Sequence, residues 1–526
     1  METAMITAAM IVFTSFFGAS LVLLLQIFDS SILKPTRLRS KLEKQGFKGP
    51  APSILYGNIP EMKGLIQLPK PPAQDSAGPP EIRHHWFPSV FPHLEHWRNE
   101  YGPAFLYSTG TIQILCISDP EMVKELSLCT SLSIGKPSYL STERGPLLGR
   151  GILSSNGPYW AHQRKIIAPE FYLDKVKGML KLMAESTLTM LKAWEKNTES
   201  LEGKVEISVD DDLRRLSADI ISRACFGRSY LQGEKIFSKL QSLQRVMSRG
   251  NIGVPGLRYL PTKHNREIWK LESEIDSMIL EVVKSRSHDD DDDDNKKDLL
   301  QLLLDAAESC GDDSNIPADI TPSKFVVDNC KNIYFAGHET TAISLAWCLM
   351  TLAAHPDWQA RAREEVLEIC GTNTPTADML RNMKVLTMVI QETLRLYPPV
   401  AYVVREALQD IQLKGINVPK GINIQVPIPI MHQFQQLWGS ESHKFKPDRF
   451  INGISGACKI PQAYMPFGMG TRTCTGQHFA MAELKVVLSL TLSRFRLSLS
   501  PAYHHSPVFR LLIQPENGVC ILLEKL

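Results

Sequence analysis

The segment from residue 322 to residue 354 constrains the fold more than any other stretch of this chain. Thr321 can act as a helix N-cap and Pro322 fits the first helical position, while His355-Pro356 ends the pattern. A helix of about 33 residues is a rod of about 50 Å. Its second half, AISLAWCLMTLAA, is apolar all round, which is typical of a helix inside a protein core. The sequence therefore predicts a large body built around one central helix.

The middle of this helix carries the motif AGHETT, Ala336–Thr341. A glycine such as Gly337 costs a helix interior roughly 1 kcal/mol relative to alanine. The hydroxyl of Thr340 can bond an upstream carbonyl and bend the helix, which would open a groove. Glu339 and Thr340 would then form a proton-delivery pair in a dry site. On this stretch alone, an exposed glutamate beside a space-filling glycine is an equally good interpretation.

Short strands are expected at residues 107–118 and 413–428, where β-prone residues flank turn signals. The remaining pattern is a succession of amphipathic helices without an internal repeat. The predicted fold class is mainly α with small β-sheets. Residues 68–80 and the run Asp289–Asp294 are interpreted as solvated loops.

The N-terminus predicts a membrane anchor. Residues 3–28 carry no charge, and about 20 apolar residues cross a bilayer core. A cleaved signal peptide is the competing interpretation, but its apolar region is usually shorter and follows basic residues. Here the basic residues follow the apolar stretch, which places the body on the cytosolic side. We expect an anchor over 1–33, a basic and Pro/Gly-rich linker and loop over 34–89, and a catalytic domain over 90–526.

Charge and cysteine usage exclude several classes of protein. The chain has 58 lysines and arginines against 56 aspartates and glutamates, without a basic stripe, so no nucleic-acid partner is expected. Its ten cysteines are scattered without a CxxC pair, which argues against a zinc site or a disulfide framework.

One cysteine, Cys474, lies in the glycine-rich loop PFGMGTRTCTG at 466–476. Glycines let the backbone approach a flat ligand closely, and Arg472 can meet a carboxylate on the same side. The helical pattern after Gly476 puts Cys474 just before a helix N-terminus, which favours a thiolate. A thiolate beside a planar, carboxylate-bearing ligand points to haem with Cys474 as axial ligand. An ordinary buried cysteine would leave the glycines and Arg472 unexplained.

Taken with other motifs in the expected order, this loop resembles that of the cytochrome P450 monooxygenases. The pair Glu392 and Arg395, one helical turn apart, is weak evidence alone, and the ordered set carries the resemblance. The matches are Trp160 and Arg164 (W-x-x-x-R), Ala336–Thr341 (A-G-x-[DE]-T-[TS]), Glu392 and Arg395 (E-x-x-R), Pro447–Phe450 (P-[ED]-R-F), and Phe467, Gly470, Arg472, Cys474 and Gly476 (F-x-x-G-x-R-x-C-x-G).

The resemblance implies a P450 fold whose long central helix crosses haem b, iron protoporphyrin IX, with Cys474 as the metal ligand. It implies that Thr340 and Glu339 deliver protons during dioxygen activation. The implied cofactor-binding residues are Cys474, Arg472, Trp160, Arg164, Arg405, Phe467, Gly468 and Gly476, and the implied structural ion network is Glu392, Arg395 and Arg449.

The finer resemblance is to plant microsomal members that oxidise isoprenoids and hormones. GILSSNGPYWAHQRKIIAPEF and LDKVKGML are similar to gibberellin-deactivating oxidases of the elongated-uppermost-internode type. This implies NADPH- and O2-dependent hydroxylation or epoxidation of a gibberellin-type diterpenoid. The alternative is hydroxylation of a triterpenoid acid or another specialised metabolite, and a less favoured function is that of a non-catalytic haem-binding protein. The segment 431–439, MHQFQQLWG, departs from the H-[RH]-D usual before the tryptophan and is expected in a surface meander.

The resemblance also implies a partner and a location. NADPH–cytochrome P450 reductase would supply electrons, because the chain has no nucleotide motif such as GxGxxG in a strand context. The protein would be a single-pass protein of the endoplasmic reticulum membrane. Its substrate pocket would be built around 139–152, 246–256 and 398–405, with ERGPLL at 143–148 over the haem face.

Overall fold

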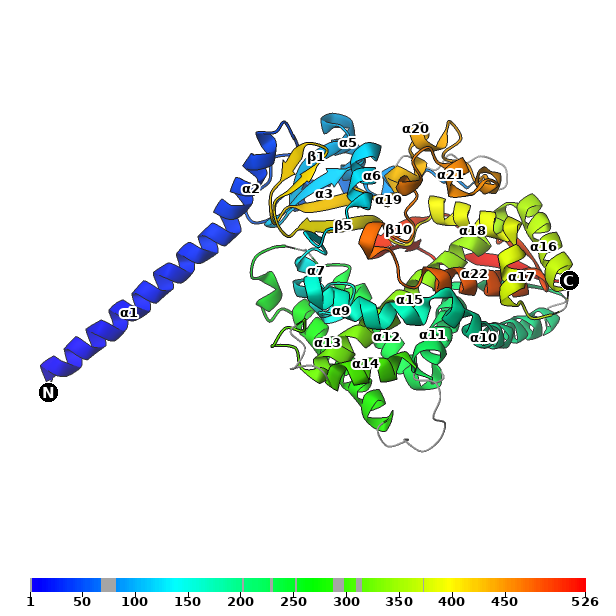
Figure 1. The fold of residues 1–526 in the computed structure, drawn as a ribbon, viewed down its shortest axis with the longest axis horizontal. Helices are drawn as coiled ribbons and strands as arrows, with labels where there is room; N and C mark the ends of the chain where they lie inside the picture. Colours follow the sequence, from blue (N-terminus) through cyan, green and yellow to red (C-terminus); the bar gives the residue numbers. More distant parts are fainter. Residues whose placement is uncertain are drawn as a thin grey trace.

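The computed structural model describes residues 2–67, 82–200, 203–227, 230–250, 253–286, 298–308, 315–371 and 373–526. The predicted loops at 68–80 and 289–294 lie outside these residues. Helix α15, Pro322–Ala354, has the bounds that the sequence predicted, and the Thr321 hydroxyl accepts a hydrogen bond from the amide of Lys324 as its N-cap. It runs through the middle of the body (Figure 1).

Helices make up most of the body, and α15 packs against α11, Asp210–Phe226, and α22, Gln477–Leu492. The predicted fold, mainly α with small sheets around a long central helix, is confirmed. The other helices of the body are α3 Ile59–Ile66, α4 Phe87–Val90, α5 Pro92–Tyr101, α6 Pro120–Leu128, α7 Tyr139–Thr142, α8 Gly145–Leu148, α9 Gly157–Ile167, α10 Leu173–Ser200, α12 Tyr230–Met247, α13 Lys263–Arg286, α14 Leu299–Glu308, α16 Pro356–Cys370, α17 Ala377–Asn382, α18 Lys384–Leu396, α19 Ile428–Gln433, α20 Gln435–Trp438 and α21 Gly453–Ala457.

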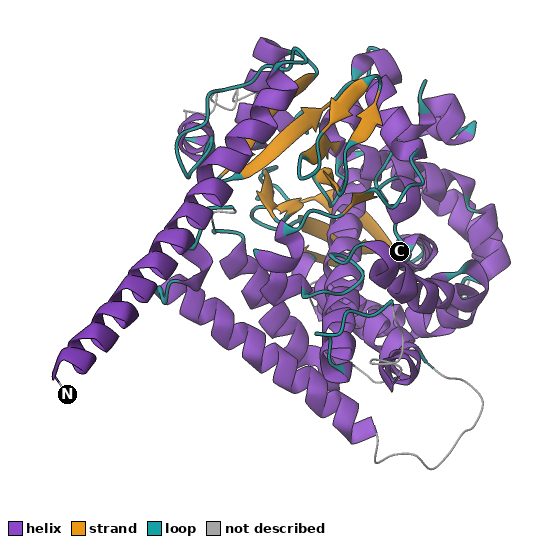
Figure 2. Cartoon of the chain, turned by 60° about the vertical axis from the view of Figure 1, so that its left-hand side comes forward, coloured by secondary structure: helices purple, strands orange, loops and turns teal. Residues whose placement is uncertain are grey.

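The strands form small sheets, the largest with the order β1-β2-β8-β5-β3, and Figure 2 shows that strands occupy one part of a largely helical body. Both predicted strand regions are confirmed, since β1 and β2 pair antiparallel and β7 and β8 lie within 413–428. The strands are β1 Ala104–Thr109, β2 Ile112–Ile117, β3 Ile134–Gly135, β4 Lys204–Ser208, β5 Tyr402–Ala407, β6 Ile411–Leu413, β7 Ile416–Val418, β8 Asn423–Pro427, β9 Phe495–Leu499, β10 Pro507–Arg510, β11 Leu512–Pro515 and β12 Cys520–Lys525.

The N-terminal helix projects from the body (Figure 1). Helix α1, Glu2–Phe28, continues through a π-helical turn, Asp29–Leu33, into α2, Lys34–Glu43. In the described part of the chain, this is one helix with the length and apolar composition to cross a membrane, and it is a candidate anchor. Its α2 end is fixed to the body, because Leu42 is fully buried.

The prediction that residues 431–439 lie in a surface meander holds only in part. Residues 431–433 end α19 and are buried, with His432 fully so, whereas α20 exposes Gln435 and Gln436. Burial lowers the pKa of His432 to about 3, so its ring is neutral. Nδ1 of His432 lies 3.1 Å from the carbonyl of Arg395, and Nε2 accepts the amide of Met465 at 2.9 Å. The segment therefore connects α18 to the chain entering the cysteine loop.

Candidate active site

A cavity of about 310 Å³ lies between α15 and the cysteine loop. Gly337, Thr340 and Ser344 line it from α15, and Phe467 and Cys474 line it from the loop. Gly337 allows α11 to approach closely, because a Cβ at this position would lie 2.7 Å from the side chain of Ile221. The cavity thus lies between two of the sequence motifs, that of the central helix and the loop of Cys474.

The loop is shaped so that the Cys474 side chain faces the cavity. Gly468 and Gly470 have φ values of 77° and 67°, which favour glycine, and the amide of Cys474 donates to the carbonyl of Phe467 at 2.8 Å. The side chain is open to the cavity although it lies deep in the body. Burial raises the pKa of the Cys474 thiol, while a hydrogen bond from the backbone of Gly476 and the charge of Arg164 oppose this rise. A cation bound at the sulfur would complete the change to thiolate.

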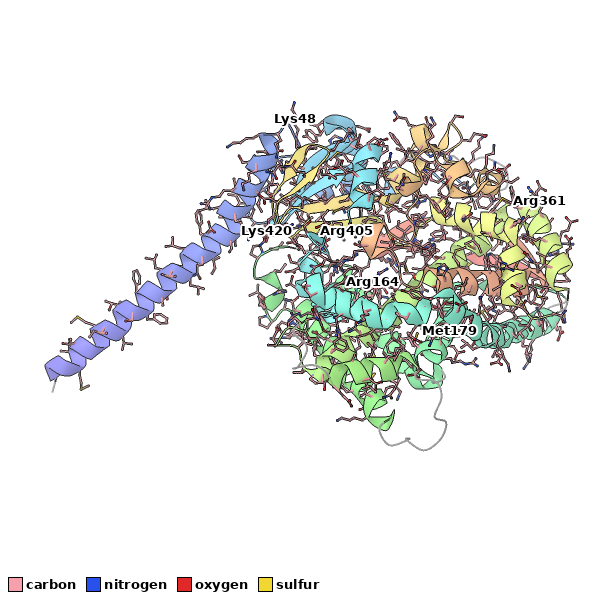
Figure 3. All side chains as sticks on the ribbon, viewed as in Figure 1. Lys48, Arg164, Met179, Arg361, Arg405 and Lys420 are labelled. Atoms are coloured by element: carbon pink, nitrogen blue, oxygen red, sulfur yellow. The ribbon has the colours of Figure 1, made fainter. Side chains whose placement is uncertain are left out.

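Four cationic side chains lie on one side of this cavity. They are Lys136, Arg164, Arg405 and Arg472. Figure 3 labels two of them, Arg164 on α9 and Arg405 on β5. Arg472 donates to the carbonyl of Ser155 at 2.9 Å, and Arg405 donates to the carbonyl of Met469 at 2.8 Å.

The four cations have no carboxylate partner in an ion pair among the described residues. Burial lowers the pKa of Lys136 to about 7, that of Arg405 to about 10 and that of Arg472 to about 9, and mutual repulsion adds to the effect on Lys136 and Arg472. Buried cations are costly unless they are paired. The two propionates of a haem are the anions that this cluster lacks, so the residues present fit the implied cofactor.

The ring of Trp160 contacts two cations of this cluster. The guanidinium carbon of Arg472 lies 3.8 Å from its ring centroid, and that of Arg164 lies 5.6 Å away. Both distances are within the range of a cation–π contact. The expected cofactor-binding residues Trp160, Arg164, Arg405, Phe467 and Gly468 all line the cavity, as do Arg472, Cys474 and Gly476.

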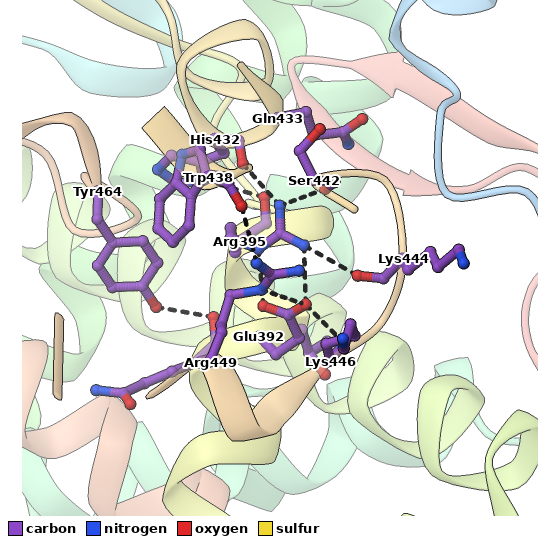
Figure 4. Close-up of polar contacts among 12 residues, drawn as sticks. Glu392, Arg395, His432, Gln433, Trp438, Ser442, Lys444, Lys446, Arg449 and Tyr464 are labelled. Atoms are coloured by element: carbon purple, nitrogen blue, oxygen red, sulfur yellow. Dashed lines mark hydrogen bonds and ion pairs between the residues drawn. The ribbon is translucent and has the colours of Figure 1, made fainter. Parts of the chain in front are cut away.

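The ion network does not line the cavity and is buried. Figure 4 shows its polar contacts. Arg395 donates from Nε to Glu392 at 2.7 Å and from Nη1 to the carbonyl of His432 at 2.8 Å. Arg449 donates from Nε to Glu392 at 3.1 Å, so this carboxylate serves both guanidinium groups. Because Glu392 and Arg395 are fully buried, the weak motif of the sequence is a structural pair in the core.

The two residues of the expected proton-delivery pair face different surroundings. Thr340 lines the cavity, and its hydroxyl donates to the carbonyl of Ala336 at 2.6 Å, as the sequence predicted. Glu339 does not line the cavity. It is buried against α11, where Oε2 lies 3.5 Å from Nε of Arg214, and its Oε1 has no hydrogen-bond partner among the described residues. The structure brings Thr340, but not the carboxylate of Glu339, to the site.

Sequence reasoning missed several lining residues. Lys136 completes the cationic cluster, although its only signal is a lysine in IGKPSYL. Of the expected pocket loops, 398–405 contributes Val400 and Tyr402, and 139–152 contributes Ile152. Segment 143–148 does not line the cavity, and neither do the described residues of 246–256.

Comparison with known proteins agrees with this geometry. The family model "Cytochrome P450" matches residues 83–522. Cytochrome P450 714C2 of Oryza sativa subsp. japonica is 53% identical, over 94% of this chain and 94% of its own length. Cytochrome P450 714A2 of Arabidopsis thaliana is 46% identical over 94% of each chain. Cytochrome P450 714B3 of Zea mays is 44% identical over 100% of this chain and 98% of its own.

Proposed function

This chain belongs to the cytochrome P450 family and is a haem-thiolate monooxygenase, and we propose that it hydroxylates or epoxidises a hydrophobic isoprenoid, in the first place a gibberellin-type diterpenoid. The observation that carries the proposal is the identity of 53% with a 714-type relative over 94% of both chains. The gibberellin part of the proposal is supported by the segments GILSSNGPYWAHQRKIIAPEF and LDKVKGML, which resemble oxidases of the elongated-uppermost-internode type. The walls of the cavity are suited to bind a rigid hydrocarbon skeleton, because they include the apolar side chains of Ile152, Leu153 and Ile221.

Haem, when bound, supplies the oxidising chemistry that inserts one atom of O2 into a substrate C–H or C=C bond. The chain's own residues hold and isolate it. Cys474 would hold the haem iron through its thiolate, and the cluster of Lys136, Arg164, Arg405 and Arg472 would neutralise the propionates. The apolar walls orient the substrate and exclude water.

Protons reach the cavity through Thr340, which presents its hydroxyl there, with Glu339 as the acid behind it. Glu339 is adjacent in the chain and buried, and one of its oxygens has no hydrogen-bond partner among the described residues. Turning away from Arg214 would let this carboxylate take up a proton from water and pass it to Thr340. This step supports net oxygen insertion rather than release of peroxide.

The remaining parts of the proposal concern partners and location. NADPH–cytochrome P450 reductase supplies the two electrons, and the protein sits in the endoplasmic reticulum membrane with its body in the cytosol. The candidate anchor α1 and the basic residues of α2 support this orientation.

Microsomes that contain the holoprotein and a plant P450 reductase test the substrate. A panel of C19 and C20 gibberellins and a panel of triterpenoid acids are supplied with NADPH, and products are identified by mass spectrometry and NMR. Conversion of a gibberellin to a product one oxygen heavier is expected. Oxidation of triterpenoid acids alone would replace the proposed substrate class, and a reduced enzyme that binds CO but oxidises neither panel would contradict the proposal.

A further inference from the structure

Side chains on one face of α15 hold the loop that follows α8. The amide of Arg150 donates to Oδ2 of Asp328 at 2.8 Å, and the amide of Leu153 donates to Oδ1 of Asn332 at 2.8 Å. Between them, the amide of Ile152 donates to Oδ1 of Asn329 at 3.1 Å. Positions 328, 329 and 332 share one side of a helix, so three loop amides are bound by one polar face.

The loop approaches α15 closely because it contains glycines. A Cβ on Gly149 would lie 2.1 Å from the carboxylate of Asp328, and a Cβ on Gly151 would lie 2.7 Å from Oδ1 of Asn332. Gly149 also has a φ of 53°, which favours glycine. Any other residue at these positions would push the loop away from the helix.

The polar face is itself buried and anchored. Asp328 is 1% exposed, and its Oδ1 lies 2.9 Å from Nζ of Lys324. Lys331 is fully buried, lies 2.8 Å from Asp276 of α13, and donates to the carbonyl of Pro146 at 3.4 Å. Burying charges costs desolvation free energy, so we expect charges that hold a loop in place to serve a purpose other than the stability of the fold.

The same loop reaches the cofactor side of the site. Gln163 of α9 donates to the carbonyl of Arg150 at 3.0 Å, and Arg472 donates to the carbonyl of Ser155 at 2.9 Å. Residues 150–155 are therefore fixed between the central helix and the cysteine loop. Within this short stretch, Ile152 and Leu153 line the cavity.

Asn332 lines the cavity and could be mistaken for a residue that binds substrate. Its Oδ1 accepts from Leu153, and its Nδ2 donates to the carbonyl of Leu148 at 2.7 Å. Both ends of the amide are thus used on the end of α8 and the loop after it, and Asn332 is 1% exposed.

We propose that Asp328 and Asn332 are positioning residues that determine where the substrate is oxidised. They fix how far the side chains of Ile152 and Leu153 extend into the cavity. These two side chains determine which carbon of a rigid polycyclic substrate faces the reactive centre. The inference rests on the proposed monooxygenase function with a hydrophobic substrate, and it assigns regioselectivity to residues that hold the wall rather than touch the ligand.

The test compares four full-length holoprotein variants with the wild type. Asn332→Ala removes both loop contacts, Asn332→Asp keeps an acceptor for Leu153, and Asp328→Asn keeps an acceptor for Arg150 without the charge. Asp319→Asn is the matched control, because it removes the charge of an ion pair with the exposed side chain of Arg150, at 2.5 Å, and leaves the loop amides bound.

Two readouts do not need the natural substrate. Hydrogen exchange of residues 150–153 should accelerate by about tenfold or more in Asn332→Ala, by less in Asn332→Asp, and not in the control. The affinity ratio between imidazole and the bulky azole clotrimazole, from spectral titrations, should change by about fivefold or more in Asn332→Ala, while imidazole affinity stays near wild type. With an oxidised substrate in hand, the ratio of regioisomers should shift, and Asn332→Ala and Leu153→Ala should be non-additive.

Wild-type exchange at 150–153 together with a wild-type azole ratio in both Asn332 variants would overturn the proposal, whatever the substrate proves to be. Faster exchange with an unchanged azole ratio would also overturn it, because the contacts would then serve folding alone. If Asn332→Ala does not bind haem, Asn332→Asp and Asp328→Asn decide by the same two measurements. Failure of the gibberellin panel affects neither of them, so the two proposals can fail separately.

Discussion

The guanidinium of Arg472 stacks on the indole of Trp160, with 3.8 Å between the guanidinium carbon and the ring centroid. Trp160 comes from α9 and Arg472 from the loop of Cys474, so one contact joins two segments that are far apart in the sequence. Arg472 is part of a cluster of cations without carboxylates, and the indole face partly offsets their repulsion.

Trp160→Ala should weaken cofactor retention. Loss of a cation–π contact of about 1–2 kcal/mol would raise the rate of haem dissociation by roughly tenfold. Trp160→Phe should keep part of the effect, and Trp269→Ala, at a partly exposed position on α13, should have none. Haem transfer to apomyoglobin measures the rate, and equal rates in Trp160→Ala and the wild type would remove Trp160 from the cofactor site.

Cys474→Ser should abolish the thiolate-type Soret band of the reduced, CO-treated protein. The only cysteine sulfur lining the described cavity is that of Cys474, so no other described thiol can replace it there. Cys129→Ser is the control, since Cys129 lies near the loop, does not line the cavity, and should leave the band unchanged. Persistence of the band in Cys474→Ser would refute the assignment of the axial ligand.

Removing the carboxylate of Glu392 should destabilise the body severely. Glu392→Ala leaves two guanidinium groups, those of Arg395 and Arg449, without their shared partner, and breaking a buried pair costs about 3–5 kcal/mol. Asp378→Ala breaks an exposed pair of the same spacing with Arg381, at 3.0 Å, and should cost less than about 0.5 kcal/mol. Thermal unfolding followed by the Soret band compares them, and similar losses would contradict the buried role of Glu392.

Thr340→Ala should uncouple electron consumption from product formation. NADPH oxidation should continue while the share of electrons recovered in product falls by about a hundredfold, the lower end of the range for a lost proton-transfer group. Thr340→Ser keeps the hydroxyl and should retain most of the coupling. Hydrogen peroxide, NADPH and product are measured together. Full coupling in the alanine variant would exclude Thr340 from proton delivery.

Glu483 should make stability fall as pH rises. Its carboxyl is fully buried on α22 and accepts a hydrogen bond from Ser217 at 2.6 Å, and burial raises its pKa from 4.5 to about 8. The folded protein therefore binds this proton more tightly than the unfolded chain. This contribution is fully present below pH 4.5 and declines, by about 1.4 kcal/mol per pH unit, until about pH 8.

Glu483→Gln mimics the neutral carboxyl and should flatten this dependence. Unfolding midpoints in urea at pH 6 and pH 8 should differ less in the variant than in the wild type. A wild-type protein that gains stability over this interval relative to Glu483→Gln would show that the group is charged in the fold.

Much of the architecture could be predicted from the sequence because its signals are local. The bounds of α15 follow from Thr321, Pro322 and His355, which act within one turn of each helix end. The cysteine loop is equally local, since Gly468 and Gly470 adopt left-handed φ values that their residue type permits. Such features depend on neighbours in the chain and can be inferred without the tertiary structure.

Other features depend on contacts between distant segments. Lys136 joins the cationic cluster only because β5 and the cysteine loop bring Arg405 and Arg472 beside it. Glu339 does not reach the cavity although it is adjacent to Thr340 in the sequence. Adjacent residues on a helix point about 100° apart, so of these two residues Thr340 lines the cavity and Glu339 does not. His432 is buried by Arg395 and Met465, neither of which is near it in the sequence.

Because the helix is continuous from α1 to α2, the rotation of the anchor about its own axis is fixed relative to the body. Arg39 of α2 donates to the carbonyl of Pro50 at 3.0 Å and Leu42 is fully buried, so the body cannot swivel freely about the helix that carries it. Where α1 spans a bilayer, its azimuth sets the face that the body turns toward the lipid. Inserting one residue in the π-helical turn at 29–33 would rotate that face by about 100°, and inserting a further three would bring it within about 40° of its original direction.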